Sequence, residues 1–102
     1  MPASRFSFTA ELWEQPGPGL WHFLSLPEAE ADDIEERFGR RAAGFGSIRV
    51  EVAIGSSRWR TSLFPDAKRA TYVLPVKKAV RVAQGLAAGS TASVDLVVLV
   101  DP

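Results

Sequence analysis

Trp59 has the surroundings best suited to ligand binding, because it lies between two arginines in the run Arg58-Trp59-Arg60. An indole ring can stack on a flat or apolar ligand, and flanking arginines can form a cationic rim. We expect Arg58, Trp59 and Arg60, together with Tyr72, to mark the mouth of a β-barrel pocket for a small anionic or aromatic ligand. The alternative is that these wide rings fill a small core or contact a second copy of the chain.

Residues that would support catalysis or metal binding are sparse. His22 is the single histidine and lies between Trp21 and Phe23, which is typical of a packed or surface side chain. The acid pairs at residues 32–33 and 35–36 do not converge on one point, since adjacent helical residues diverge by roughly 100°. Neither a Gly-x-Ser-x-Gly elbow nor a serine–lysine pair at helical spacing occurs. We therefore expect a non-catalytic binding module for a small anionic or aromatic ligand or for a partner protein, with no cofactor and no metal.

Charge is strongly segregated along the chain, although the formal net charge is +0. Residues 11–36 hold eight acids and no lysine or arginine, whereas residues 58–81 hold seven bases and one acid. These two segments either pair in the fold or in a dimer, or they leave a basic face free for an anion. The basic residues that could contact a nucleic acid are Lys68, Arg69, Lys77, Lys78 and Arg81.

Nucleic-acid binding is therefore the alternative function. The zero net charge argues against this function, because nucleic-acid-binding domains usually carry a basic excess. No exposed helix long enough to read a major groove is expected, so binding of this kind would be weak and largely non-specific.

Length and composition favour one ordinary globular domain over residues 1–102, with 46% hydrophobic and 24% charged residues. The absence of cysteine excludes disulfides and thiolate metal sites. No run approaches the ~20 apolar residues of a membrane span, and the first residues do not resemble a signal peptide. We expect a cytoplasmic protein with no membrane contact.

The hydrophobic pattern predicts a mainly β fold with two short helices. Alternation predicts strands over residues 5–13, 20–26, 48–54, 58–64 and 70–74, and a final strand. Helical spacing predicts helices near Glu28–Phe38 and Lys77–Gln84, and a turn is expected at Pro65-Asp66. The last strand, Val94–Val100, is apolar on both faces, which suits the centre of a closed barrel or a dimer seam. We accordingly expect a homodimer through Val94–Val100.

Several of these segments together resemble a bacterial family known as domain of unknown function 1905. The matching pieces are residues 6–12, Trp21-His22-Phe23, Leu26-Pro27, residues 50–55, 61–65, 72–81 and 85–89. The chain departs from the family at Gly89-Ser90, where relatives carry Gly-Asp, and at Ile54-Gly55, where many carry Asn-Gly.

The resemblance implies a six- or seven-stranded pseudobarrel related to the double-split barrels of AbrB-type transition-state regulators, which are DNA-binding dimers. The segment from Leu74-Pro75 to Gly89 is similar to a corner of those proteins. The resemblance implies no catalytic residues, because it brings no established activity.

Overall fold

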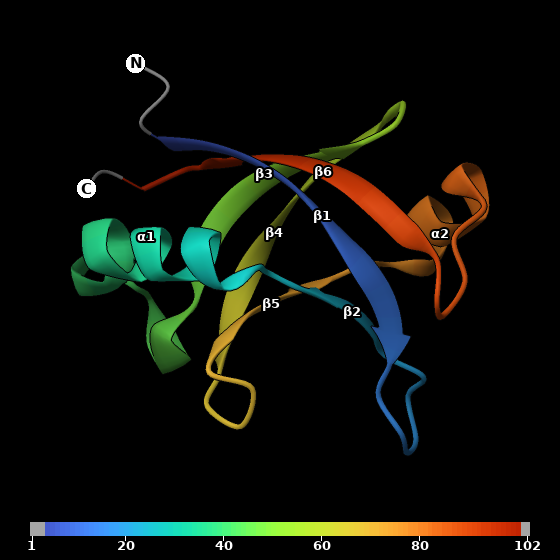
Figure 1. Cartoon of the computed structure of the whole chain (residues 1–102), viewed down its shortest axis with the longest axis horizontal. Helices are drawn as coiled ribbons and strands as arrows, with labels where there is room; N and C mark the ends of the chain where they lie inside the picture. Colours follow the sequence, from blue (N-terminus) through green and yellow to red (C-terminus); the bar gives the residue numbers. More distant parts are fainter. Residues whose placement is uncertain (1–3, 101–102) are drawn as a thin grey trace.

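Six antiparallel strands close into a barrel with a helix at each end, in a computed structural model that describes residues 4–100 apart from the side chains of Arg41 and Phe45 (Figure 1). The elements are β1 (Arg5–Glu14), β2 (His22–Ser25), α1 (Glu28–Phe38), β3 (Ile48–Ile54), β4 (Ser57–Asp66), β5 (Thr71–Pro75), α2 (Lys78–Gln84) and β6 (Thr91–Val98). Around the barrel the strands run β1-β2-β5-β4-β3-β6, and β6 pairs with β1 to complete the ring. The predicted mainly β barrel with two helices is confirmed.

The barrel interior is built by the period-two alternation visible in the sequence. In β3, every second residue from Ile48 to Ile54 is buried, and in β6 the buried residues are Ala92, Val94, Leu96 and Val98. Leu12, Leu24 and Leu74 are opposite one another across β1, β2 and β5, and all three are almost completely buried. Apolar residues therefore line the inside of the ring.

The two helices lie at opposite ends of the barrel, α1 on the left and α2 on the right of Figure 1. α1 packs a stripe of three buried residues, Ala31, Ile34 and Phe38, against the core. α2 buries Val80 and ends at Gly85, whose φ of 64° is in the left-handed region that glycine enters without penalty. α1 closes one end of the barrel, and α2 lies beside the other.

Within residues 4–100 the barrel has six strands, the smaller of the two numbers expected. Three details differ from the sequence prediction. β2 begins at His22 instead of residue 20, because Leu20 has a φ of 50° and cannot continue a ladder. β4 runs through the expected turn at Pro65-Asp66, where Pro65 is opposite Tyr72, and the chain reverses at residues 67–70. β6 runs from Thr91 to Val98 instead of Val94–Val100. It begins earlier than expected because Thr91 to Ser93 already pair with β1.

The wall of the barrel has an opening between β4 and β5, because these two strands pair over only a short stretch. β4 pairs with β5 only where Phe64–Asp66 meet Val73–Thr71, whereas its earlier residues, Ser57–Leu63, pair with β3 alone. β5 continues past this point to Pro75 along β2. β4 and β5 therefore separate beyond Phe64, and the inward-facing side chains of β4 become accessible from outside.

Candidate functional site

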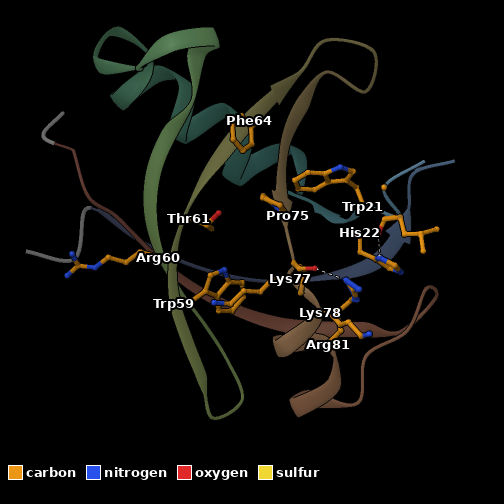
Figure 2. Close-up of a pocket in the computed structure, with 13 residues that line it drawn as sticks. Trp21, His22, Trp59, Arg60, Thr61, Phe64, Pro75, Lys77, Lys78 and Arg81 are labelled. Atoms are coloured by element: carbon orange, nitrogen blue, oxygen red, sulfur yellow. Dashed lines mark hydrogen bonds between the residues drawn. The ribbon is translucent and has the colours of Figure 1, made fainter. Parts of the chain in front are cut away.

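A cleft of about 640 Å³ lies where β4 and β5 separate. Its sides come from β4 (Trp59, Thr61 and Phe64), from the end of β5, from the start of α2, and from Leu20 to His22. Figure 2 shows these side chains around the opening, with Trp59 across from Trp21. The volume is within the ~300–1,000 Å³ usual for small-molecule sites.

Aromatic rings form the apolar part of the cleft. Trp59 is half-buried and packs against the core, because it is on the inward face of β4 next to the diverging strand. Trp21 and Phe64 are 58% and 41% exposed, which is unusual for side chains of this size. The cleft therefore offers accessible ring faces to a flat ligand.

Local backbone geometry places the Trp21 ring. Gly19 has a φ of 100°, and a Cβ there would be 3.1 Å from both Cδ1 and Nε1 of the indole. The Gln15 amide donates to the Trp21 carbonyl at 2.8 Å, which closes the β1–β2 turn. Trp21 also stacks on Phe23, with ring centroids 6.1 Å apart and planes inclined by 10°. The turn at Pro16-Gly17-Pro18-Gly19 therefore positions the exposed indole of Trp21.

Cations from α2 and the residue before it form the polar part of the cleft. Lys77, Lys78 and Arg81 line it, and no aspartate or glutamate of residues 4–100 does. Arg81 Nη1 donates to the Val76 carbonyl at 3.0 Å, which fixes the guanidinium beside the end of β5. Among the ion pairs within residues 4–100, none includes these three side chains. The lining of the cleft is therefore cationic, whereas the carboxylate of Glu14 is in the lining of an adjoining depression, where it borders His22, Lys78 and Arg81.

Of the two arginines that flank Trp59, Arg60 borders the cleft and Arg58 does not, and neither guanidinium points into it (Figure 2). The two arginines alternate with Trp59 along β4, so they are on the outer surface, and both contact Glu51 on β3. Arg58 Nη1 is 3.7 Å and Arg60 Nε 3.6 Å from the Glu51 carboxylate. Figure 2 shows the Arg60 side chain pointing away from Trp59. Of the predicted rim, only Trp59 has its functional group in the cleft.

Tyr72 is also separate from the cleft. It is 7% exposed and borders a different depression, together with Asp32 and Glu35 of α1 and Pro65 of β4. Burial, followed by the negative charge of Glu35, raises the pKa of the Tyr72 phenol above its usual 10.0. These surroundings keep the phenol neutral, and the structure does not place Tyr72 beside Trp59.

The predicted basic residues divide into two groups. Lys68 and Arg69 are in the β4–β5 turn, whereas Lys77, Lys78 and Arg81 are beyond the other end of β5, a strand of five residues that spans about 17 Å. Arg69 is held in place, with Nη1 3.0 Å from Asp66 and its guanidinium 3.9 Å from the Trp13 ring centroid. A single continuous basic face is therefore not formed.

Asp66 organises that turn. Its carboxylate accepts hydrogen bonds from the amides of Lys68 and Arg69, at 3.1 and 3.2 Å, and from the Arg69 side chain. Burial alone would raise the pKa of Asp66, but these bonds and the charge of Arg69 hold it below its usual 3.8.

Comparison with known proteins places the chain in a family. Residues 8–96 match the model described as Domain of unknown function (DUF1905). The chain belongs to this family. No curated protein matches it.

His22 borders the cleft of this DUF1905 domain, and a hydrogen bond to the backbone fixes its ring. Its Nδ1 is 3.0 Å from the Leu20 carbonyl oxygen, which can only accept, so Nδ1 carries the proton. In the neutral ring, Nε2 is then an acceptor. Within residues 4–100, no cluster of three or more histidines and acids could hold a metal ion.

The acidic and basic segments of the DUF1905 domain do not pair with each other in the described part of the chain. The four ion pairs there join residues close in the fold, such as Arg37 with Asp33 at 2.8 Å within α1. The first of the two charge interpretations, internal pairing, is thus not seen among these contacts.

β6, the predicted dimer seam, is paired along both edges, with β1 and with β3. A dimer through Val94–Val100 would have to use the outer face, where Val97 is half-buried and Leu99 is 40% exposed. The homodimer stays a prediction.

Neither α1 nor α2 is long and apolar enough to cross a bilayer, and no other helix of residues 4–100 is.

Sequence reasoning named Trp59, Trp21 and the basic residues but did not join them. Phe64 was missed as a site residue. Its signal was its position on the outward face of β4, where a large aromatic ring has no barrel interior to fill.

Proposed function

We propose that this DUF1905 domain is a non-catalytic binding module whose cleft takes a small organic anion with a flat, apolar body. The observation that supports this proposal is that exposed aromatic rings and three cations line one cleft, whereas no acid of residues 4–100 lines it.

Each half of the cleft favours one half of such a ligand. Trp59 and Trp21 offer indole faces on which a ring gains contact area. Lys77 and Lys78 carry charges on flexible stems that can reach a carboxylate or phosphate, and the fixed Arg81 can add a hydrogen bond. A ligand that is both aromatic and anionic would use both halves at once.

The test uses 1-naphthoate and its neutral analogue 1-naphthalenemethanol, followed by isothermal titration calorimetry and by the indole N–H signals in NMR spectra. We expect naphthoate to bind at millimolar or lower concentration, to shift the Trp59 indole signal, and to bind more tightly than the alcohol. The double variant Lys77→Gln/Lys78→Gln should weaken naphthoate binding about tenfold, since each charge pair contributes up to about 1 kcal/mol.

The matched control is Arg49→Gln/Arg58→Gln, which removes two positive charges from the outer faces of β3 and β4. It should leave the affinity unchanged. Equal losses in both double variants would show that net charge alone attracts the probe. An unshifted Trp59 signal at millimolar naphthoate would refute the proposal.

Relation to the AbrB-type double-split barrels, with nucleic acid as ligand, is the alternative proposal. The closed six-stranded barrel is compatible with it, whereas the separation of Lys68 and Arg69 from the cleft reduces the basic surface available to a phosphate backbone. Titration with oligo(dT) distinguishes the two, because single-stranded DNA loses affinity with a slope of about 0.7 per phosphate contact on a log–log salt plot. Naphthoate, with one charge, should respond far less.

A further inference from the structure

A row of apolar side chains crosses the outer surface of the barrel, where strand alternation normally places polar residues. The register sets Trp13 opposite Phe23 and Phe23 opposite Pro75, and it sets Val73 opposite Phe64. The inward residues between them, such as Leu24 and Leu74, already fill the core. These four strands therefore carry apolar residues on both faces. In the outer row Phe64 is exposed, Trp13, Phe23 and Pro75 are half-buried and Val73 is 7% exposed.

This outer row borders a second hollow of about 510 Å³. Its own lining is Gln15, Pro16, Pro18, Phe23 and Val73, none of them charged, and it shares Trp21, Phe64 and Pro75 with the cleft. Figure 2 shows these three shared side chains gathered on one side of the cleft. The two hollows thus meet along Trp21, Phe64 and Pro75, one basic and one uncharged.

We propose, resting on the function proposed above, that the two hollows form one groove for an extended segment of a partner protein. Acidic residues of the segment lie in the cleft beside Lys77, Lys78 and Arg81, and proline or aromatic residues lie over Phe23 and Val73. Charge complementarity assigns the acidic end, because three cations and no carboxylate of residues 4–100 line the cleft.

The lining of the second hollow assigns the other end. Aromatic-lined grooves can bind segments in the polyproline II conformation, which is preformed and therefore loses little entropy on binding. About eight residues in that conformation span roughly 25 Å, at about 3.1 Å per residue, and the protein measures 33 × 29 × 21 Å. A segment of that length therefore extends over most of one face of the protein.

A nucleic acid fits this surface less well. Single strands carry phosphate at every step, and their affinity depends on cations along the whole path. In the described part of the chain, no cation lines the second hollow. A small anion would fill only the cleft, and it would leave the second hollow unfilled.

The experiment selects peptides of about ten residues from a random phage-displayed library on the intact protein, and the best one is synthesised and titrated calorimetrically. We expect selected sequences to combine acidic residues on one side with proline or aromatic residues on the other. In NMR spectra the peptide should shift the amides of Phe23 and Val73 as well as the cleft residues, whereas naphthoate should shift the cleft alone.

Two variants separate this inference from the proposed function. Phe23→Ala should weaken the peptide about tenfold, as expected when a central aromatic anchor is truncated, and leave naphthoate unchanged. Lys77→Gln/Lys78→Gln should weaken both. If Phe23→Ala perturbs the fold, the amide shifts of the wild-type protein still decide.

Selected peptides that are acidic throughout, or that leave Phe23 and Val73 unshifted, would overturn the extended groove but not the anion site. Failure to select any sequence pattern would also overturn it. Loss of naphthoate binding itself would instead overturn the proposed function.

Discussion

Substitution of Gly55 by alanine is expected to loosen α2 through a single side chain. Gly55 has a φ of 58°, and a Cβ built there overlaps Oε1 of Gln84 and is 2.8 Å from its Cδ. Gln84 Nε2 donates to the Ser56 and Ser57 hydroxyls, at 3.2 and 3.0 Å, and so ties the last turn of α2 to the β3–β4 turn. The new methyl group must displace Gln84 and break both bonds.

The cost has two parts. Alanine in the left-handed region costs about 1 kcal/mol relative to glycine. Each lost hydrogen bond costs about 1 kcal/mol, so Gly55→Ala should lower the free energy of unfolding by about 3 kcal/mol. Gln84→Ala removes only the hydrogen bonds and should cost about 2 kcal/mol. In the double variant nothing remains to clash, and the cost should again be about 3 kcal/mol, well below the additive value of about 5.

Urea unfolding of the four proteins in this cycle measures these values, and a loss of 3 kcal/mol should lower Tm by roughly 12–24 °C. Gly85→Ala is the matched control, because Gly85 has a similar φ of 64° and a Cβ there meets nothing within 4 Å. It should cost only the conformational part, about 1 kcal/mol. Additive losses in the double variant, or equal losses at Gly55 and Gly85, would refute this account of α2.

Two further outcomes concern pH and assembly. Asp66→Asn should destabilise the protein at neutral pH, and the difference in stability from wild type should shrink as pH falls below 3.8. The reason is that the pKa of Asp66 is lowered on folding, so its carboxyl group stabilises the protein only while that group is ionised. A gap that stays constant down to the acid transition, followed by circular dichroism, would contradict this. Sedimentation equilibrium should show a dimer if the outer face of β6 associates, and a clean monomer at high micromolar concentration would end that prediction.

Local signals in the sequence were enough for most of the fold. Alternation identified β1 and β3 because each buries one face, and a narrow apolar stripe identified α1. Errors occurred where backbone conformation decided the outcome. Pro65 was expected to start a turn, yet a proline can occupy a strand position where it need not donate to the ladder.

The site was harder to predict because it depends on which strands separate. Trp59 faces inward as alternation required, but alternation also sends Arg58 and Arg60 outward to Glu51, away from the ligand. Tyr72 is opposite Pro65 in the β4–β5 pairing, so it is buried near α1 and away from Trp59. Trp21 and the start of α2 border the same cleft only because β2 pairs with β5, which no short-range pattern encodes.

Net charge was a poor guide to the surface of this domain. The formal total of zero combines acids on α1 with bases beside α2, and Figure 1 places these helices at opposite ends of the barrel. At physiological ionic strength the Debye length is about 8 Å, which is far shorter than the 33 Å length of the molecule, so each end presents its own field. A ligand approaching the cleft therefore encounters Lys77, Lys78 and Arg81 without compensation from α1. A cationic cleft is thus consistent with a neutral chain, because the acidic residues of α1 are too far away to repel an anion from the cleft.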